Sequence, residues 1–177
     1  WGRRVTSVFF GGGTPSLFTA PAIDAILTAV RARLALAPDA EVTLEANPGT
    51  VEAGKFRDFH AAGVNRLSLG IQSFNPGHLK TLGRIHDGAQ AHRAAELALR
   101  TFANVNLDLM YGLPGQTLAE AEADMATAST LTPAHISAYH LTLEPNTYFH
   151  RYPPALPDDD ATADMQSAIE SRLAAAG

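Results

Sequence analysis

Short apolar segments alternate with longer helical patterns along this chain, and that alternation constrains the fold more than any other feature. Strands of this kind, each followed by one or more helices, form a mostly parallel sheet. The expected strands are Val5–Phe10, Glu41–Ala46, Asn65–Ile71, Val105–Met110 and Ile136–Leu143. The expected helices are Ala22–Leu36, Thr50–Ala62, Pro76–Leu82, Ala89–Thr101, Leu118–Leu131 and Asp159–Ala175. The chain is therefore expected to be an α/β protein, either an open doubly wound sheet or part of a (β/α) barrel.

The pattern within the strands favours the barrel. Side chains on a strand alternate between two faces, and each of the three central strands has one apolar and one polar face. The polar faces carry Thr43, Glu45 and Asn47, then Arg66, Ser68, Gly70 and Gln72, then Asn106 and Asp108. A doubly wound sheet buries both faces, and an unpaired charge buried there costs on the order of several kcal/mol. We therefore predict a partial (β/α) barrel of about five parallel strands, with the polar face lining the lumen.

In α/β barrels the functional groups lie at the carboxyl ends of the strands. The residues expected at this end are Gly11, Gly12, Gly13, Thr14, Glu45, Asn47, Gln72, Ser73, Asp108, Tyr111, His140 and Thr142. The glycines let the backbone approach a ligand with exposed N–H groups, and Thr14 adds a hydroxyl. Such a loop suits a carboxylate or an α-amino-acid group, and the alternative is a tight strand-to-helix turn.

The charged candidates each have a functional and a structural interpretation. Glu45 could hold an ammonium group or a pair of ribose hydroxyls, or form a salt bridge with Arg66 or Arg84. Asp108 has the same alternatives. Gln72 could bind a carboxylate or hydroxyl, or simply line the lumen. Arg84 could clamp a carboxylate through two hydrogen bonds, or be exposed to solvent.

Several function classes are excluded or disfavoured by composition and spacing. The chain of 177 residues has no cysteine, so its own residues form no disulfide, thiolate nucleophile or Cys-ligated metal centre. A net charge of −5 argues against a nucleic-acid partner. No phosphate loop, dinucleotide fingerprint, His-Glu-x-x-His or Gly-x-Ser-x-Gly motif occurs, and the histidine spacing predicts no metal site. The run Asp158–Asp160 is predicted to cap the last helix. No segment has the length of a transmembrane helix.

Five motifs in order resemble a known family. They are Val8–Ser16 (VFFGGGTPS), Glu45–Gly49 (EANPG), Gly70–Phe74 (GIQSF), Leu82–His86 (LGRIH) and Asp108–Thr117 (DLMYGLPGQT). Together they are similar to the radical S-adenosylmethionine (SAM) domain of oxygen-independent coproporphyrinogen III oxidase-like proteins. Leu141–Thr147 and Pro157–Asp160 resemble the haem chaperone HemW branch more closely.

The resemblance implies a SAM site built from seven residues. Gly12, Gly13 and Thr14 would hold the methionyl amino and carboxylate end, and Glu45, Gln72, Arg84 and Asp108 would contact the other polar groups. In this family SAM binds a [4Fe–4S] cluster and is cleaved to a 5′-deoxyadenosyl radical. The oxidase decarboxylates porphyrinogen propionates with it, whereas the HemW branch is thought to bind haem and deliver it to acceptor proteins.

The cluster cysteines of the family are absent from this chain. The resemblance places them just before Trp1, and the family's C-terminal domain with its haem motif after Gly177. We therefore expect residues 1–177 to be the central part of a radical SAM core domain, cytoplasmic, and unable to assemble the cluster or cleave SAM alone.

Three hypotheses remain open on the sequence. The first is the SAM-binding core of a HemW-like protein, with the coproporphyrinogen III oxidase as its enzymatic alternative. The second is a non-catalytic tetrapyrrole carrier in which a histidine such as His140 ligates haem. The third is an unrelated barrel hydrolase or isomerase with Glu45 and Asp108 as an acid/base pair, which requires both carboxyl groups to face one cavity.

Overall fold

The computed structural model describes residues 2–50 and 53–176. Its strands are β1 (Arg4–Phe10), β2 (Ala35–Ala46), β3 (Arg66–Gln72), β4 (Asn104–Tyr111) and β5 (His135–His140). Its α-helices are α1 (Ala20–Arg33), α2 (Ala53–Ala61), α3 (Pro76–Thr81), α4 (Gly88–Thr101), α5 (Leu118–Thr130), α6 (Tyr148–Arg151) and α7 (Asp159–Ala176). Two 3₁₀ turns, η1 (Pro15–Leu17) and η2 (Pro48–Thr50), follow β1 and β2.

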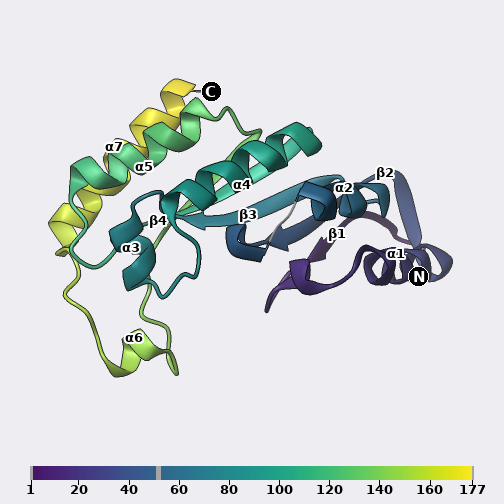
Figure 1. Cartoon of the computed structure of the whole chain (residues 1–177), viewed down its shortest axis with the longest axis horizontal. Coiled ribbons are helices and arrows are strands. Elements are labelled where there is room, and N and C mark those ends of the chain that lie inside the picture. The colour runs from purple at the N-terminus through teal and green to yellow at the C-terminus, as the bar shows by residue number, and fades with distance from the viewer. Residues whose placement is uncertain (1, 51–52, 177) are drawn as a thin grey trace.

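The strands form one parallel sheet in the order β1-β2-β3-β4-β5. The sheet curls into a half-barrel, which confirms the predicted fold class. Helices α4, α5 and α7 are stacked on one side of it, and α1 and α2 lie beside its first strands (Figure 1). Since every neighbouring pair of strands is parallel, all carboxyl ends meet at one rim.

The predicted apolar strand faces make the core. Alternating residues of β2, β3 and β4 are buried in one cluster with residues of α1, α2, α4, α5 and α7. These strand residues are even-numbered on β2 and odd-numbered on β3 and β4. The strand members of this cluster are Val42, Leu44, Ala46, Leu67, Leu69, Ile71, Val105, Leu107, Leu109 and Tyr111. Phe56, Phe59 and Phe102 are at most 2% exposed, and the rings of Phe56 and Phe102 meet edge to face with their centroids 6.0 Å apart. The polar strand faces are thereby left to the other side of the sheet.

Several element boundaries differ from the sequence prediction, most of all in α1, β2 and β5. The helix expected over Ala22–Leu36 ends at Arg33, because Ala35 and Leu36 already pair with β1. The register then shifts, and regular pairing resumes at Glu41, where the strand was predicted to begin. Strand β5 ends at His140 rather than Leu143, since Glu144 N–H donates to the Thr142 carbonyl in a tight turn.

The segment after β5 contains a short helix that the sequence prediction lacks. Helix α6 is a single turn capped by the Thr147 side chain, too short to show a helical period. It projects away from the sheet on a long connection (Figure 1). Among the described residues, no helix combines the length and apolarity needed to cross a membrane.

Candidate functional site

The polar strand ends line a single cavity of about 510 Å³. That volume lies in the range of small-molecule sites. Its lining residues come from every strand and from the connections after β1, β2 and α3: Phe9, Gly13, Pro15, Glu45, Ala46, Asn47, Arg66, Ser68, Gly70, Gln72, Arg84, Asn106, Asp108, Ser137 and Tyr139. The structure thus brings together five of the seven predicted site residues: Gly13, Glu45, Gln72, Arg84 and Asp108.

Glu45 joins the end of β2 to the glycine loop after β1. Its Oε2 accepts a hydrogen bond of 3.0 Å from the Gly12 amide. Gly12 and Gly13 have φ values of +79° and +60°, a backbone region that favours glycine. The predicted alternative, an ion pair between Glu45 and an arginine, is not formed among the described residues, where Arg66 pairs with Glu41 instead.

Asp108 is held in place by two neighbours on the polar face. Ser68 Oγ donates to its Oδ2 and Asn106 Nδ2 donates to its Oδ1, each at 2.8 Å. The orientation of the Asn106 amide is set by Asp108, because a reversed amide would face the carboxylate with its own oxygen. Asn106 Oδ1 in turn accepts from Ser137 Oγ at 3.0 Å. The carboxylate of Asp108 is therefore fixed toward the cavity before any ligand binds.

Gln72 and Tyr139 form a direct contact across the cavity. The Tyr139 hydroxyl donates to Gln72 Oε1 at 2.5 Å. Burial raises the pKa of Tyr139, and the negative charge of Asp108 raises it further. The phenol therefore stays protonated at neutral pH and acts as a hydrogen-bond donor.

Gly12, Thr14 and Arg84 complete the predicted set. Arg84 lines the cavity from the α3–α4 connection, with an exposed side chain. Thr14 precedes η1 and its carbonyl accepts from Leu17 N–H. Neither Gly12 nor Thr14 is among the residues that line the cavity, although Gly12 is tied to it through Glu45. A role for these two residues in ligand binding stays a prediction.

Four residues expected at the mouth of the barrel lie elsewhere. Ser73 turns away from the cavity, and its hydroxyl donates to Asp124 on α5 at 2.6 Å. Tyr111 is buried in the core and packs against His140, with 5.5 Å between the ring centroids. Thr142 lines a separate cavity beside α6. Because β5 presents its odd-numbered residues to the lumen, His140 does not reach the polar cavity.

Sequence reasoning missed Ser137 and Tyr139 as lining residues of the cavity. The signal was present, since Ile136 and Ala138 are apolar and alternate with Ser137 and Tyr139. The register pairs Ser137 with Asp108, so the odd positions of β5 continue the polar face of β4. The described residues include no group of three or more His, Cys, Asp or Glu side chains placed to hold a metal ion.

The sequence matches known proteins over nearly its whole length. The family model of the radical SAM superfamily matches residues 1–128. The heme chaperone HemW of Escherichia coli is 56% identical over 99% of this chain and 47% of that protein. The heme chaperone HemW of Haemophilus influenzae is 50% identical over 99% of this chain and 46% of that protein. The chain thus spans about half the length of these curated relatives.

Solved structures share the half-barrel. Coproporphyrinogen III oxidase (HemN) from Escherichia coli, described as a radical SAM enzyme, superposes with a TM-score of 0.87 at 27% identity. The match covers 99% of this chain and 42% of that one. Elp3 of Methanocaldococcus infernus superposes with a TM-score of 0.77 at 17% identity over 95% of this chain and 45% of that one, a likeness of fold alone.

Proposed function

Because this chain belongs to the radical SAM superfamily, we propose that its polar cavity binds SAM and that the chain is the SAM-binding core of a HemW-like haem chaperone. The observation that carries the proposal is the convergence of two carboxylates, Glu45 and Asp108, with Gln72 in one cavity at the carboxyl ends of the strands. The glycine loop after β1 borders the same cavity through Gly13.

The chemistry of these residues matches the polar groups of SAM. SAM carries a sulfonium cation, an α-ammonium group, a carboxylate and two ribose hydroxyls. Glu45 and Asp108 would accept hydrogen bonds from the ammonium or hydroxyl groups and offset the positive charge. Arg84 would pair with the carboxylate, and Gln72 offers both a donor and an acceptor. The loop Gly12–Thr14 would contact the methionyl end.

The superfamily's [4Fe–4S] cluster, which supplies one-electron chemistry when bound, finds no ligand in this chain. None of its 177 residues is a cysteine, and thiolates are the usual ligands of such a cluster. The chemistry proposed for this chain is therefore the binding of SAM.

The haem-related part of the proposal rests on the curated relatives, which are named heme chaperones. Binding of haem, and its delivery to acceptor proteins in the cytoplasm, are proposed for the whole protein. The conversion of a porphyrinogen, as in HemN, is the enzymatic alternative. At 56% identity HemW is the better guide to this chain than HemN at 27%.

The test is calorimetric titration of the full-length protein with SAM under anaerobic conditions. Glu45→Gln and Asp108→Asn each remove one negative charge at nearly constant size. We expect each to weaken SAM binding by about tenfold or more, because a desolvated charge pair is lost. Asp164→Asn, an exposed position on α7, is the matched control and leaves binding unchanged.

The same titration distinguishes SAM from other ligands. S-Adenosylhomocysteine lacks the sulfonium charge and should bind native protein more weakly, with a smaller loss on Glu45→Gln. Both carboxyl groups face one cavity, as an acid/base hydrolase also requires. No measurable SAM binding by native protein would therefore contradict the proposal and leave that hypothesis standing. Haem titration of native protein and His140→Ala would show whether this part of the chain contributes a haem ligand.

A further inference from the structure

Gln72 occupies a backbone conformation that its side chain does not favour. Its φ is +68°, in the left-handed region that non-glycine residues seldom adopt. The register also shifts here, with Gly70 opposite Asp108 but Gln72 opposite Leu109. A bulge of this kind redirects a side chain, and this one presents the Gln72 amide to Tyr139 in the cavity. A conformation that costs about 1–3 kcal/mol persists only where its surroundings hold it.

The backbone on both sides of Gln72 is anchored by buried side chains. On the near side, His86 Nε2–H donates to the Ile71 carbonyl at 3.2 Å. On the far side, Asp124 of α5 accepts from the Ser73 hydroxyl at 2.6 Å and from the Phe74 amide at 2.8 Å. Asp124 is 3% exposed and does not line the cavity.

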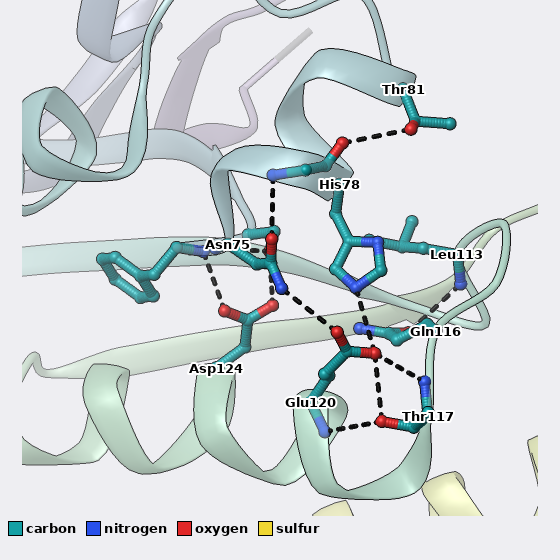
Figure 2. Close-up of polar contacts among 11 residues, drawn as sticks. Asn75, His78, Thr81, Leu113, Gln116, Thr117, Glu120 and Asp124 are labelled. Atoms are coloured by element: carbon teal, nitrogen blue, oxygen red, sulfur yellow. Dashed lines mark hydrogen bonds and ion pairs between the residues drawn. The ribbon is translucent and has the colours of Figure 1, made fainter.

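Asp124 belongs to a wider set of contacts between α5 and the connection after β3. Figure 2 shows Asp124 and Glu120 side by side on α5, facing Asn75 and His78. The Asn75 side chain donates to Glu120 Oε1 at 3.3 Å, and His78 Nε2 lies 3.5 Å from Glu120 Oε2. Within this set, Asp124 accepts from both residues directly after Gln72, and the Asn75 amide donates to Ser73 Oγ at 3.0 Å.

We infer that Asp124 is a positioning residue of the cavity: it holds Ser73 and Phe74 and thereby keeps Gln72 in its left-handed conformation with its amide facing the ligand. The role rests on the proposed function only for the identity of that ligand. A carboxylate suits the task, because two oxygens accept two hydrogen bonds at once. Without it, the half-buried Phe74 amide would lose its partner, a cost that relaxation of the loop would relieve.

The test measures the pKa of Tyr139, which reports the position of Gln72, and it needs no ligand. Ionisation of Tyr139 removes the proton that its hydroxyl donates to Gln72 Oε1, so the pKa of Tyr139 depends on whether Gln72 stays in place. If Asp124→Ala releases Gln72, the pKa of Tyr139 departs from its native value. Carbon-13 labelling of the four tyrosines, with Tyr139→Phe for assignment, makes this pKa measurable by NMR. Ser73→Ala removes one of the two hydrogen bonds and serves if Asp124→Ala does not fold.

A conservative variant separates positioning from general stability. In Asp124→Asn the amide oxygen still accepts from Phe74 N–H, while its NH₂ donates to Ser73 Oγ, so the titration of Tyr139 returns to native. Ser129→Ala removes from the same helix a hydroxyl that donates to the Met125 carbonyl at 2.8 Å, and it leaves the titration unchanged. In full-length protein, SAM affinity should fall by about tenfold or more in Asp124→Ala and recover in Asp124→Asn.

The outcomes are distinguishable. A folded Asp124→Ala or Ser73→Ala variant with native Tyr139 titration overturns the positioning role. A shifted pKa of Tyr139 in Asp124→Ala, with recovery in Asp124→Asn, supports it. If native protein binds no SAM, the proposed function fails, and the Tyr139 titration still decides the role of Asp124.

Discussion

At the scale of single residues, His86 links the stability of the fold to pH. Its side chain is 4% exposed, and burial lowers its pKa below the ordinary value of 6.5. The hydrogen bond to the Ile71 carbonyl raises the pKa but does not offset the burial. The unfolded chain therefore binds a proton at His86 at a higher pH than the folded chain does.

This difference predicts that the free energy of unfolding falls as the pH drops from 6.5 toward the lowered pKa of His86. His86→Gln keeps a donor for the Ile71 carbonyl and removes the titration, so we expect a shallower pH dependence in that window. Urea unfolding at a series of pH values measures it. A variant with the full native slope would show that His86 is not the group responsible.

Replacement of glycine by alanine should change the free energy of unfolding in opposite directions at Gly88 and Gly54. A Cβ at Gly88, the first residue of α4, would lie 2.2 Å from the Phe74 carbonyl oxygen, so Gly88→Ala should cost about 1–3 kcal/mol. Gly54 in α2 has no described atom within 4 Å of such a Cβ. Gly54→Ala should stabilise by about 0.5 kcal/mol, since alanine favours the helix. Thermal unfolding of both variants decides, and equal effects would contradict the structure.

At the scale of elements, α7 depends on its cap. Asp158 Oδ1 accepts from Ala161 N–H at 2.8 Å, which confirms that the Asp158–Asp160 run caps the last helix. Helix α7 buries Met165 and Ile169 against the core. We expect Asp158→Ala to cost about 1 kcal/mol of unfolding free energy. Asp164→Ala, in the exposed middle of α7, should change stability by no more than about 0.5 kcal/mol in chemical denaturation. Equal losses would exclude a capping role.

The elements also show how far the sequence predicts this site. Alternation of polar and apolar residues in β2, β3 and β4 correctly placed Glu45, Gln72 and Asp108 around one cavity. It failed in β5, because the apolar residue Leu141 extended the apparent strand beyond His140 and drew attention to the even positions. Only the pairing of Ser137 with Asp108 fixes which face of β5 meets the lumen.

Contacts between distant elements are absent from any local pattern. The bulge at Gln72 depends on its pairing with β4. The hydrogen bonds from Ser73 and Phe74 to Asp124 join residues that are 51 and 50 positions apart in the sequence. The sequence predicts Ser73 as a site residue because it follows Gln72, yet its side chain bonds to α5 on the opposite side of the sheet. Sequence spacing therefore identifies the polar groups of this site, whereas the helices behind the sheet determine how they are held.

At the scale of the whole molecule, the half-barrel has two open edges. In the described part of the chain, β1 pairs only with β2, and β5 only with β4. An unpaired strand edge is a template for another chain. Phe9 of β1 is 58% exposed and adds apolar surface beside that edge.

We therefore expect the 177-residue chain, produced alone, to associate through β1. Light scattering after gel filtration should give a molar mass that rises with protein concentration. Thr6→Lys combined with Ser7→Lys places two charges on exposed positions of β1 and should keep the chain monomeric, because paired edges would bring like charges together. Ala174→Lys with Ala175→Lys adds the same charge to exposed positions of α7 and should not prevent association. A native chain that stays monomeric at high concentration, or two double variants that behave alike, would rule out the β1 edge as the contact.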